Sequence, residues 1–139
     1  MDKSYSEWDF DVVVIGAGGA GLRAAIEASS SGAKVGMISK SMLGKAHTVM
    51  AEGGAAAALA NKDHRDSWKI HFRDTMKGGK YLSDWRMAKV HAQQAPDRIR
   101  ELEQWGAVFD RTSEGKTSQR NFGGHTYPRL AHIGDATGL

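Results

Sequence analysis

The sequence predicts an α/β fold built on a parallel β-sheet that this stretch of chain does not complete. Three observations carry the prediction: an apolar β-branched run that ends at glycine, a small-residue helical pattern directly after it, and a second apolar run after that helix. With 139 residues, 40% hydrophobic and 25% charged, the composition is that of a globular protein. The length fits one modest domain or a part of a larger one.

The first three elements form a strand–helix–strand unit. Apart from Asp11, residues 10–15 are apolar on both faces and rich in valine, which predicts a buried strand in a parallel sheet. Small residues at 21–28 predict a helix with one apolar face, and Gly32 is suited to end it. Residues 33–39 predict the second strand, which completes a right-handed βαβ unit.

Helices dominate the next part of the predicted fold. Residues 40–66 are rich in Gly, Ala and Ser, and the alanine run at 55–60 predicts a short helix. Asp66 and Ser67 are suited to cap a helix that runs to about Lys77.

Two further helices are expected before the chain turns to loop. The first covers about 85–94 after an Asp84 cap, and the second begins at Pro96 and runs to about Trp105. Residues 108–109 predict a short strand, and the chain from 110 to its end reads as loop. The pattern at 134–139 is that of a turn entering a helix, so we expect a truncated segment of a larger protein.

Composition excludes several classes of function. The net charge of +3 is scattered rather than gathered in a stripe with aromatic residues, so no nucleic-acid partner is predicted. The absence of cysteine excludes disulfides, iron–sulfur ligation and thiolate zinc sites within these residues. His64, His71 and His91 have no metal-like spacing, and no metal site is predicted. No apolar run is long enough to span a bilayer, and the polar N-terminus is unlike a targeting peptide, so the chain is expected to face the cytosol.

A glycine-rich loop between the first strand and the helix indicates dinucleotide binding. The loop reads Gly16-Ala17-Gly18-Gly19-Ala20-Gly21, which matches the pattern G-x-G-x-x-G in its required context. Gly16 permits the tight turn, Gly18 allows the backbone to approach a pyrophosphate, and Gly21 allows close helix–strand packing. A Rossmann-like cofactor domain is therefore predicted, and a glycine turn without a ligand is the alternative.

The end of the second strand bears on which dinucleotide binds. NAD sites place an acidic residue there for the ribose hydroxyls, whereas this chain has Ser39 and Lys40, with no acid until Glu52. This disfavours NAD. Lys40 remains compatible with an NADP 2′-phosphate, with the phosphates and ribose of FAD, or with a solvated lysine.

Four segments, taken together in order and spacing, resemble the flavoprotein subunit of succinate dehydrogenase and fumarate reductase. They are Val-Ile-Gly-Ala-Gly-Gly-Ala-Gly at 14–21, Ser-Lys at 39–40, His-Thr-Val-Met-Ala-Glu-Gly-Gly at 47–54 and Phe-Gly-Gly at 122–124. The resemblance runs from about Phe10 to the last residue and covers roughly the first quarter of such a subunit. It implies that residues 1–139 are the N-terminal part of an FAD-binding domain, without the capping and C-terminal domains.

The resemblance also implies site residues. His47 corresponds to the histidine that is bonded through its imidazole to the 8α carbon of FAD, whereas a lone histidine here would otherwise be interpreted as a surface or hydrogen-bonding residue. Thr48, Gly53 and Gly54 would lie against the cofactor, together with the glycine loop, Ser39 and Lys40. Gly53 and Phe122 would border the substrate.

One position departs from the family, and three others are weaker candidates. Many relatives have Gln where this chain has Glu52, which puts Glu52 in doubt as a contact for a dicarboxylate. His125, Arg129 and His132 are less favoured for carboxylate binding, because the family's principal substrate-binding and proton-donating residues lie beyond residue 139. No catalytic residue is therefore expected within this chain.

The activity implied by the resemblance is that of an FAD-dependent oxidoreductase. The intact subunit would interconvert succinate and fumarate by hydride transfer to or from FAD and pass electrons to an iron–sulfur subunit. Membrane anchor subunits would hold it peripherally at the cytoplasmic face of the inner or plasma membrane. The alternatives are a soluble flavoenzyme similar to L-aspartate oxidase, which usually lacks the linking histidine, and a non-catalytic dinucleotide-binding fragment. The 139 residues alone are expected to be inactive.

Overall fold

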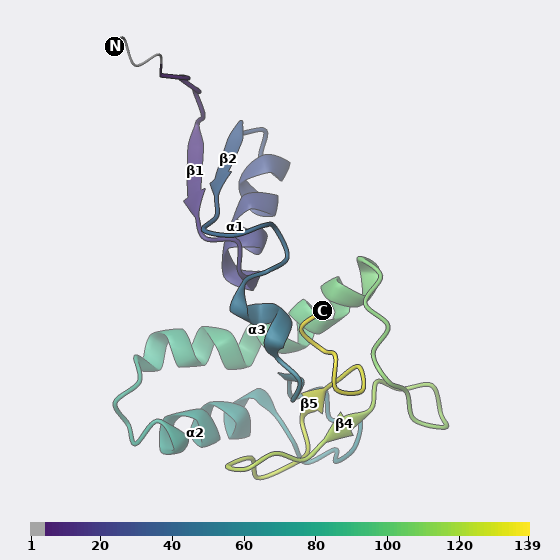
Figure 1. The fold of residues 1–139 in the computed structure, drawn as a ribbon. Coiled ribbons are helices and arrows are strands. Elements are labelled where there is room, and N and C mark those ends of the chain that lie inside the picture. The colour runs from purple at the N-terminus through teal and green to yellow at the C-terminus, as the bar shows by residue number, and fades with distance from the viewer. Residues whose placement is uncertain (1–4) are drawn as a thin grey trace. The chain divides into compact units, whose positions relative to one another are not determined.

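The computed structural model describes residues 5–139, and these divide into two compact units (Figure 1). The first unit extends to Met50 and includes Leu139, and the second comprises Ala51–Gly138. Each unit has its own sheet, so each is described separately.

The first unit contains the predicted strand–helix–strand arrangement. Strand β1 (Val12–Ile15) is followed by helix α1 (Gly19–Ser30) and strand β2 (Val35–Ile38), and a 3₁₀ turn, η1 (His47–Met50), comes later. The two strands are parallel and in register from Val12↔Val35 to Ile15↔Ile38. Helix α1 contacts both strands (Figure 1). The α/β class with an incomplete parallel sheet is therefore confirmed.

The strands of the first unit are more exposed than their sequences predict. Val14 faces α1, because a Cβ built on Gly21 of that helix would lie 3.4 Å from Val14 Cγ1. Side chains alternate along a strand, so Val13 and Ile15 point to the opposite face, where they are 50% and 83% exposed. The prediction of a buried strand is wrong within this structure, since only one face of the sheet is covered by a helix.

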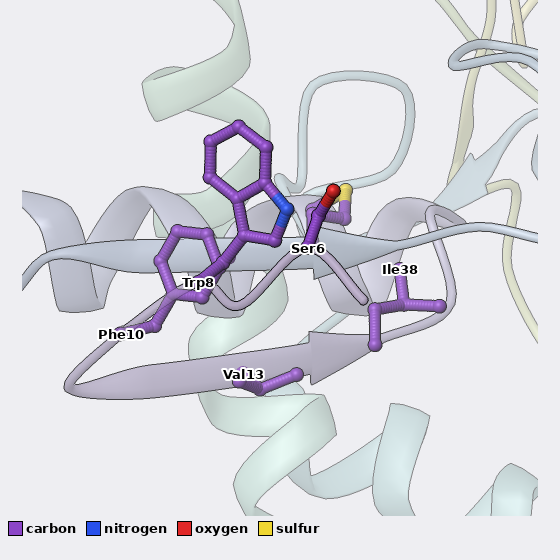
Figure 2. Close-up of a pocket in the computed structure, with 7 residues that line it drawn as sticks. Ser6, Trp8, Phe10, Val13 and Ile38 are labelled. Carbon is purple, nitrogen blue, oxygen red and sulfur yellow. The ribbon is translucent and has the colours of Figure 1, made fainter. Parts of the chain in front are cut away.

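The open face carries a shallow apolar pocket formed within the first unit. Figure 2 shows Trp8, Phe10, Val13 and Ile38 around it. The Phe10 ring lies over Gly36, where an added Cβ would stand 2.7 Å from Phe10 Cδ2. The N-terminal segment therefore shields the centre of this face, and its flanks remain exposed.

The second unit is an antiparallel sheet with two helices. Its strands are β3 (Ala55–Ala56), β4 (Gln119–Arg120) and β5 (Leu130–Ala131), in the order β3-β5-β4. Ala131 lies opposite both Ala55 and Gln119. Two predictions are wrong here: residues 55–60 are not a helix, and the chain after 110 is not all loop. The alanine run pairs with β5, which overrides its helical propensity.

The helices α2 (Trp68–Gly78) and α3 (Trp85–Gln104) pack against each other. The predicted cap is confirmed at Asp84, whose carboxylate accepts hydrogen bonds from the N–H groups of Arg86 and Met87. The predicted break at Pro96 is wrong, because α3 continues through it. A proline removes only one helical hydrogen bond, and Ala95 and Ile99 beside it are buried in the core.

The core of the second unit is small and built mainly from short side chains. Its buried members are Ala57, Ala95, Ile99, Phe109 and Ala131. Residues 108–109 are not a strand as predicted, and Phe109 serves instead as the aromatic member of this core. Among residues 5–139, no helix combines the length and the apolar character needed to cross a bilayer.

Candidate functional site

The glycine loop adopts a backbone that larger residues resist. Gly16 has φ of +105°, and its N–H donates to the Ile38 carbonyl at 2.8 Å, which ties the loop to the end of β2. A Cβ on Gly21 would collide with the Gly16 carbonyl oxygen. Helix α1 can therefore begin directly against the end of β1, as the glycine pattern predicts.

The residue at the N-cap position of α1 supplies no side chain to cap the helix. Gly18 occupies the cap position in an extended conformation, and the first turn holds no acidic residue. Its Gly19 N–H donates to the Thr48 hydroxyl at 2.9 Å. The first turn, which also contains Ala20 and Gly21, is suited to an anion, because the helix dipole and backbone N–H groups favour negative charge there.

Beside this helix end lies a cavity of about 290 Å³ formed entirely within the first unit. Its lining residues come from the glycine loop, the end of β2 and the segment before η1: Gly16, Ala17, Gly18, Ser39, Lys40, Ser41, Lys45, Ala46 and His47. Five residues predicted from the sequence thus share one cavity. Lys45 was missed, although its place two residues before His47 was a usable signal.

Charge and accessibility define what this cavity can bind. Lys40 and Lys45 both line it, so it offers two cationic side chains beside a helix N-terminus, which favours a diphosphate. His47 is exposed, and its imidazole makes no hydrogen bond within residues 5–139. The ring is therefore accessible for bonding to a ligand, while Thr48 next to it is held on the glycine loop.

The remaining predicted residues lie in the second unit. A Cβ built on Gly53 would stand 3.8 Å from Phe122 Cε2, so the two residues are neighbours, and the Phe122 ring is 60% exposed. Gly54 has φ of +121°, and an added Cβ would lie 2.7 Å from the Ala131 carbonyl oxygen. Glu52 is exposed, and its carbonyl accepts from Arg120 at 2.7 Å.

Arg129 is not placed to bind a substrate. Its side chain is fully buried, and its guanidinium pairs with Asp66 at 2.8 Å and with Asp74 at 2.9 Å. We refer to Arg129, Asp66 and Asp74 as the buried ion cluster. Asp74 also accepts two hydrogen bonds from Thr126, one from its N–H and one from its hydroxyl. The cluster therefore joins α2 to the chain before β5.

Burial lowers the pKa of two imidazoles near this cluster, those of His71 and His125. Burial, with a smaller contribution from Arg129, lowers the pKa of His71 to about 4, and the same two causes lower the pKa of His125. His71 is buried, and the centre of its ring lies 5.1 Å from the centre of the His91 ring. Within residues 5–139, no group of three or more His, Asp or Glu is arranged to hold a metal ion. The Nδ1 atom of His132 lies 2.8 Å from Oδ2 of Asp110.

The donor set of the first unit fits a dinucleotide cofactor. It combines a glycine cradle that a Cβ at Gly21 would close, a helix N-terminus with no acidic residue in its first turn, two lysines and an accessible imidazole. This combination can bind a diphosphate and place a second group of the same cofactor at His47.

Comparison with known proteins identifies the class of domain. The sequence profile described as "FAD binding domain" matches residues 11–138. One subunit of the fumarate reductase (CoM/CoB) of Methanothermobacter marburgensis is 48% identical over 132 residues, which is 94% of this chain and 24% of that protein. The succinate dehydrogenase flavoprotein subunit of Rickettsia bellii is 48% identical over 128 residues, which is 91% of this chain and 21% of that protein.

Structural comparison agrees. The structure described as Mycobacterium smegmatis Sdh1 in complex with UQ1 superimposes with a TM-score of 0.90 at 69% identity, over 93% of this chain and 22% of that one. The chain thus spans less than a quarter of the length of the relatives it matches.

Proposed function

The chain belongs to the family of FAD binding domains, and from this premise we propose that it is the FAD-binding part of a succinate dehydrogenase or fumarate reductase flavoprotein subunit. The observation that carries the proposal is the cavity of the first unit. It brings the glycine loop, Ser39, Lys40 and His47 together in one place. Relatives named for succinate dehydrogenase and for fumarate reductase support this class over an L-aspartate oxidase-like enzyme.

The glycine loop and the lysines bind the diphosphate of FAD in this proposal. N–H groups at the start of α1 donate to it, and Lys40 and Lys45 neutralise its charge. The Thr48 hydroxyl already accepts from Gly19, so Thr48 holds η1 against the loop and leaves its own proton free to donate.

His47 is proposed to hold the flavin covalently through its imidazole and the 8α carbon. Its exposure at the cavity wall and the absence of a hydrogen-bond partner within the described residues support this role. A neutral imidazole is a competent nucleophile near pH 7. The bond fixes the ring and raises its potential, which favours oxidation of a saturated carbon–carbon bond.

The proposed reaction interconverts succinate and fumarate. When bound, FAD supplies the acceptor for the hydride that leaves one methylene carbon of succinate, while a proton leaves the adjacent carbon. The proton is assigned to an arginine outside these residues. Gly53 and Phe122 would border the substrate, with the exposed Phe122 ring as an apolar wall.

The proposed reaction requires partner subunits that accept its electrons. In this proposal the two electrons pass singly to an iron–sulfur subunit, since residues 1–139 contain no cysteine and hold no cluster themselves. Membrane anchor subunits would hold the complex at the cytoplasmic face of the inner or plasma membrane. The 139 residues alone are not expected to complete the reaction.

The covalent bond is tested on the intact flavoprotein in complex with its partners. A denaturing gel viewed under ultraviolet light should show a fluorescent band for the wild type, because only covalent flavin survives denaturation. The His47→Ser variant should lose that band, release its FAD into acid, and lose succinate oxidation more than fumarate reduction.

A matched control is His64→Ser, which removes an exposed imidazole from the second unit. It should keep the fluorescent band and both activities. A wild-type band without flavin fluorescence, from a well-assembled preparation, would refute the covalent bond. A protein that retains FAD but turns over neither succinate nor fumarate would refute the proposed substrate class.

A further inference from the structure

Arg120 binds an unusual set of acceptors. Its Nε donates to the Gly53 carbonyl at 2.8 Å, and its Nη2 donates to the Glu52 carbonyl at 2.7 Å. The same guanidinium reaches the Gly134 carbonyl at 3.1 Å and the Asp135 carboxylate at 3.3 Å. We call this arrangement the carbonyl clamp. It is centred on a half-buried side chain of β4.

The clamp fixes the direction of two successive peptide groups. A trans peptide is planar, with its C=O and N–H pointing in opposite directions, and none of the described peptides is cis. Because the Glu52 and Gly53 carbonyls both point to Arg120, the N–H groups of Gly53 and Gly54 point away from it. Neither N–H donates a hydrogen bond within residues 5–139.

The surrounding structure holds this segment in place from two other sides. The Gly138 N–H donates to the Ala51 carbonyl at 2.8 Å, which ties the start of the segment to the end of the second unit. Gly54 lies so close to β5 that an added Cβ would stand 2.7 Å from the Ala131 carbonyl oxygen. Two aligned, unpaired N–H groups in a fixed backbone form a ready donor site for an electron-rich group.

We propose that Arg120 is a positioning residue for the flavin, which turns the Gly53 and Gly54 N–H groups toward the flavin ring. The proposal rests on the proposed function, which puts this segment against the cofactor. Reduction increases the negative charge on a flavin, so fixed N–H donors stabilise the reduced form and raise its midpoint potential. The same strand that carries Arg120 leads directly to Phe122, which lies beside Gly53.

The test measures the flavin midpoint potential and absorption spectrum of the intact, assembled flavoprotein carrying Arg120→Ala. We expect a lower potential, a changed spectrum and a fall in kcat for succinate of about tenfold, with flavin content and KM little changed. Arg120→Lys keeps the charge, but its single ammonium cannot reproduce the planar fork, so it should lie between the wild type and Arg120→Ala.

The control is Arg111→Ala. Arg111 is also a partly exposed arginine of the second unit, and it pairs at 2.6 Å with Glu103, which is not a member of the clamp. Its replacement should leave the potential unchanged. A folded Arg120→Ala protein with an unchanged potential and spectrum would overturn the inference, even if its thermal midpoint fell.

If Arg120→Ala does not fold, the potential of Arg120→Lys decides in the same way. Failure of the proposed function can be told apart from failure of this inference, because in that case the wild type itself would lack bound flavin or succinate turnover.

Discussion

The two units hold their functional segments by different means. In the first, the backbone dominates: glycines shape the loop, and the Gly16 N–H ties that loop to the end of β2, beside the cavity. In the second, long polar side chains dominate, with Arg120 binding carbonyls and Arg129 binding carboxylates. The site in the first unit therefore depends on positions that carry no side chain, whereas the scaffold of the second unit depends on particular long side chains.

The two units also differ in how far apart in the sequence their contacting residues lie. The first unit joins β1 to β2 across a single helix. In the second unit, Arg120 bonds to a carbonyl 68 positions away, and Arg129 pairs with a carboxylate 63 positions away. Substitutions at the polar anchors of the second unit should therefore disrupt more structure than substitutions in the loop of the first.

The largest effect is expected at Arg129. The change Arg129→Met in the intact protein leaves Asp66 and Asp74 buried without their cation, which should cost about 3–5 kcal/mol of unfolding free energy. Denaturant unfolding measures the loss. The matched control Arg65→Met breaks the exposed pair with Asp63 and should shift the midpoint little. Equal losses from the two variants would mean that the buried ion cluster does not anchor the second unit.

The next effect is a pH dependence from the same region. Burial lowers the pKa of His71 from 6.5 to about 4, so the unfolded chain binds a proton in this window that the folded chain does not. Stability should therefore fall as pH drops from about 6.5 to 4, by up to about 3 kcal/mol. His71→Gln should remove that part of the pH dependence, as followed by thermal unfolding across the window. Parallel curves for the variant and the wild type would contradict the assignment.

A smaller effect is expected in the first unit. Gly21→Ala drives a Cβ into the Gly16 carbonyl and should cost about 1–3 kcal/mol as the loop shifts, with weaker FAD binding as a consequence. Gly18→Ala is the informative comparison, because its Cβ would meet Thr48 Oγ1 at an ordinary 3.4 Å. We expect Gly18→Ala to keep the stability of the flavin-free protein and to weaken only FAD binding, measured by titration. A Gly18→Ala variant as unstable as Gly21→Ala would argue that the loop has no steric selectivity.

Sequence patterns were sufficient where local rules decide the structure. Gly16, Gly18 and Gly21 indicate a strand–turn–helix through their spacing alone, and Asp84 indicates a helix start. The structure adds that Ser39, Lys40 and His47 line the same cavity as that loop. Lys45 shares the cavity without belonging to any motif.

Patterns failed where tertiary contacts override local preference. The alanines at 55–60 favour a helix in isolation, but pairing of Ala55 with Ala131 makes a strand. Pro96 signals a helix start, yet burial of Ala95 and Ile99 carries one helix through it. Nothing around Arg129 in the sequence identifies partners as distant as Asp66 and Asp74. These contacts depend on how the whole unit packs, which local spacing does not encode.

The central place of β5 has a consequence for the order in which the molecule forms. Both β3 and β4 pair with β5, which comes last in the sequence of the three. A chain emerging from the ribosome can close the β1–β2 ladder as soon as residue 38 is free. The second sheet cannot form until residues 130–131 have been made, because β3 and β4 both pair with β5. Closing a long loop before that strand exists would cost conformational entropy that no contact compensates. During synthesis, the cofactor cradle therefore becomes available before the scaffold that carries Arg120.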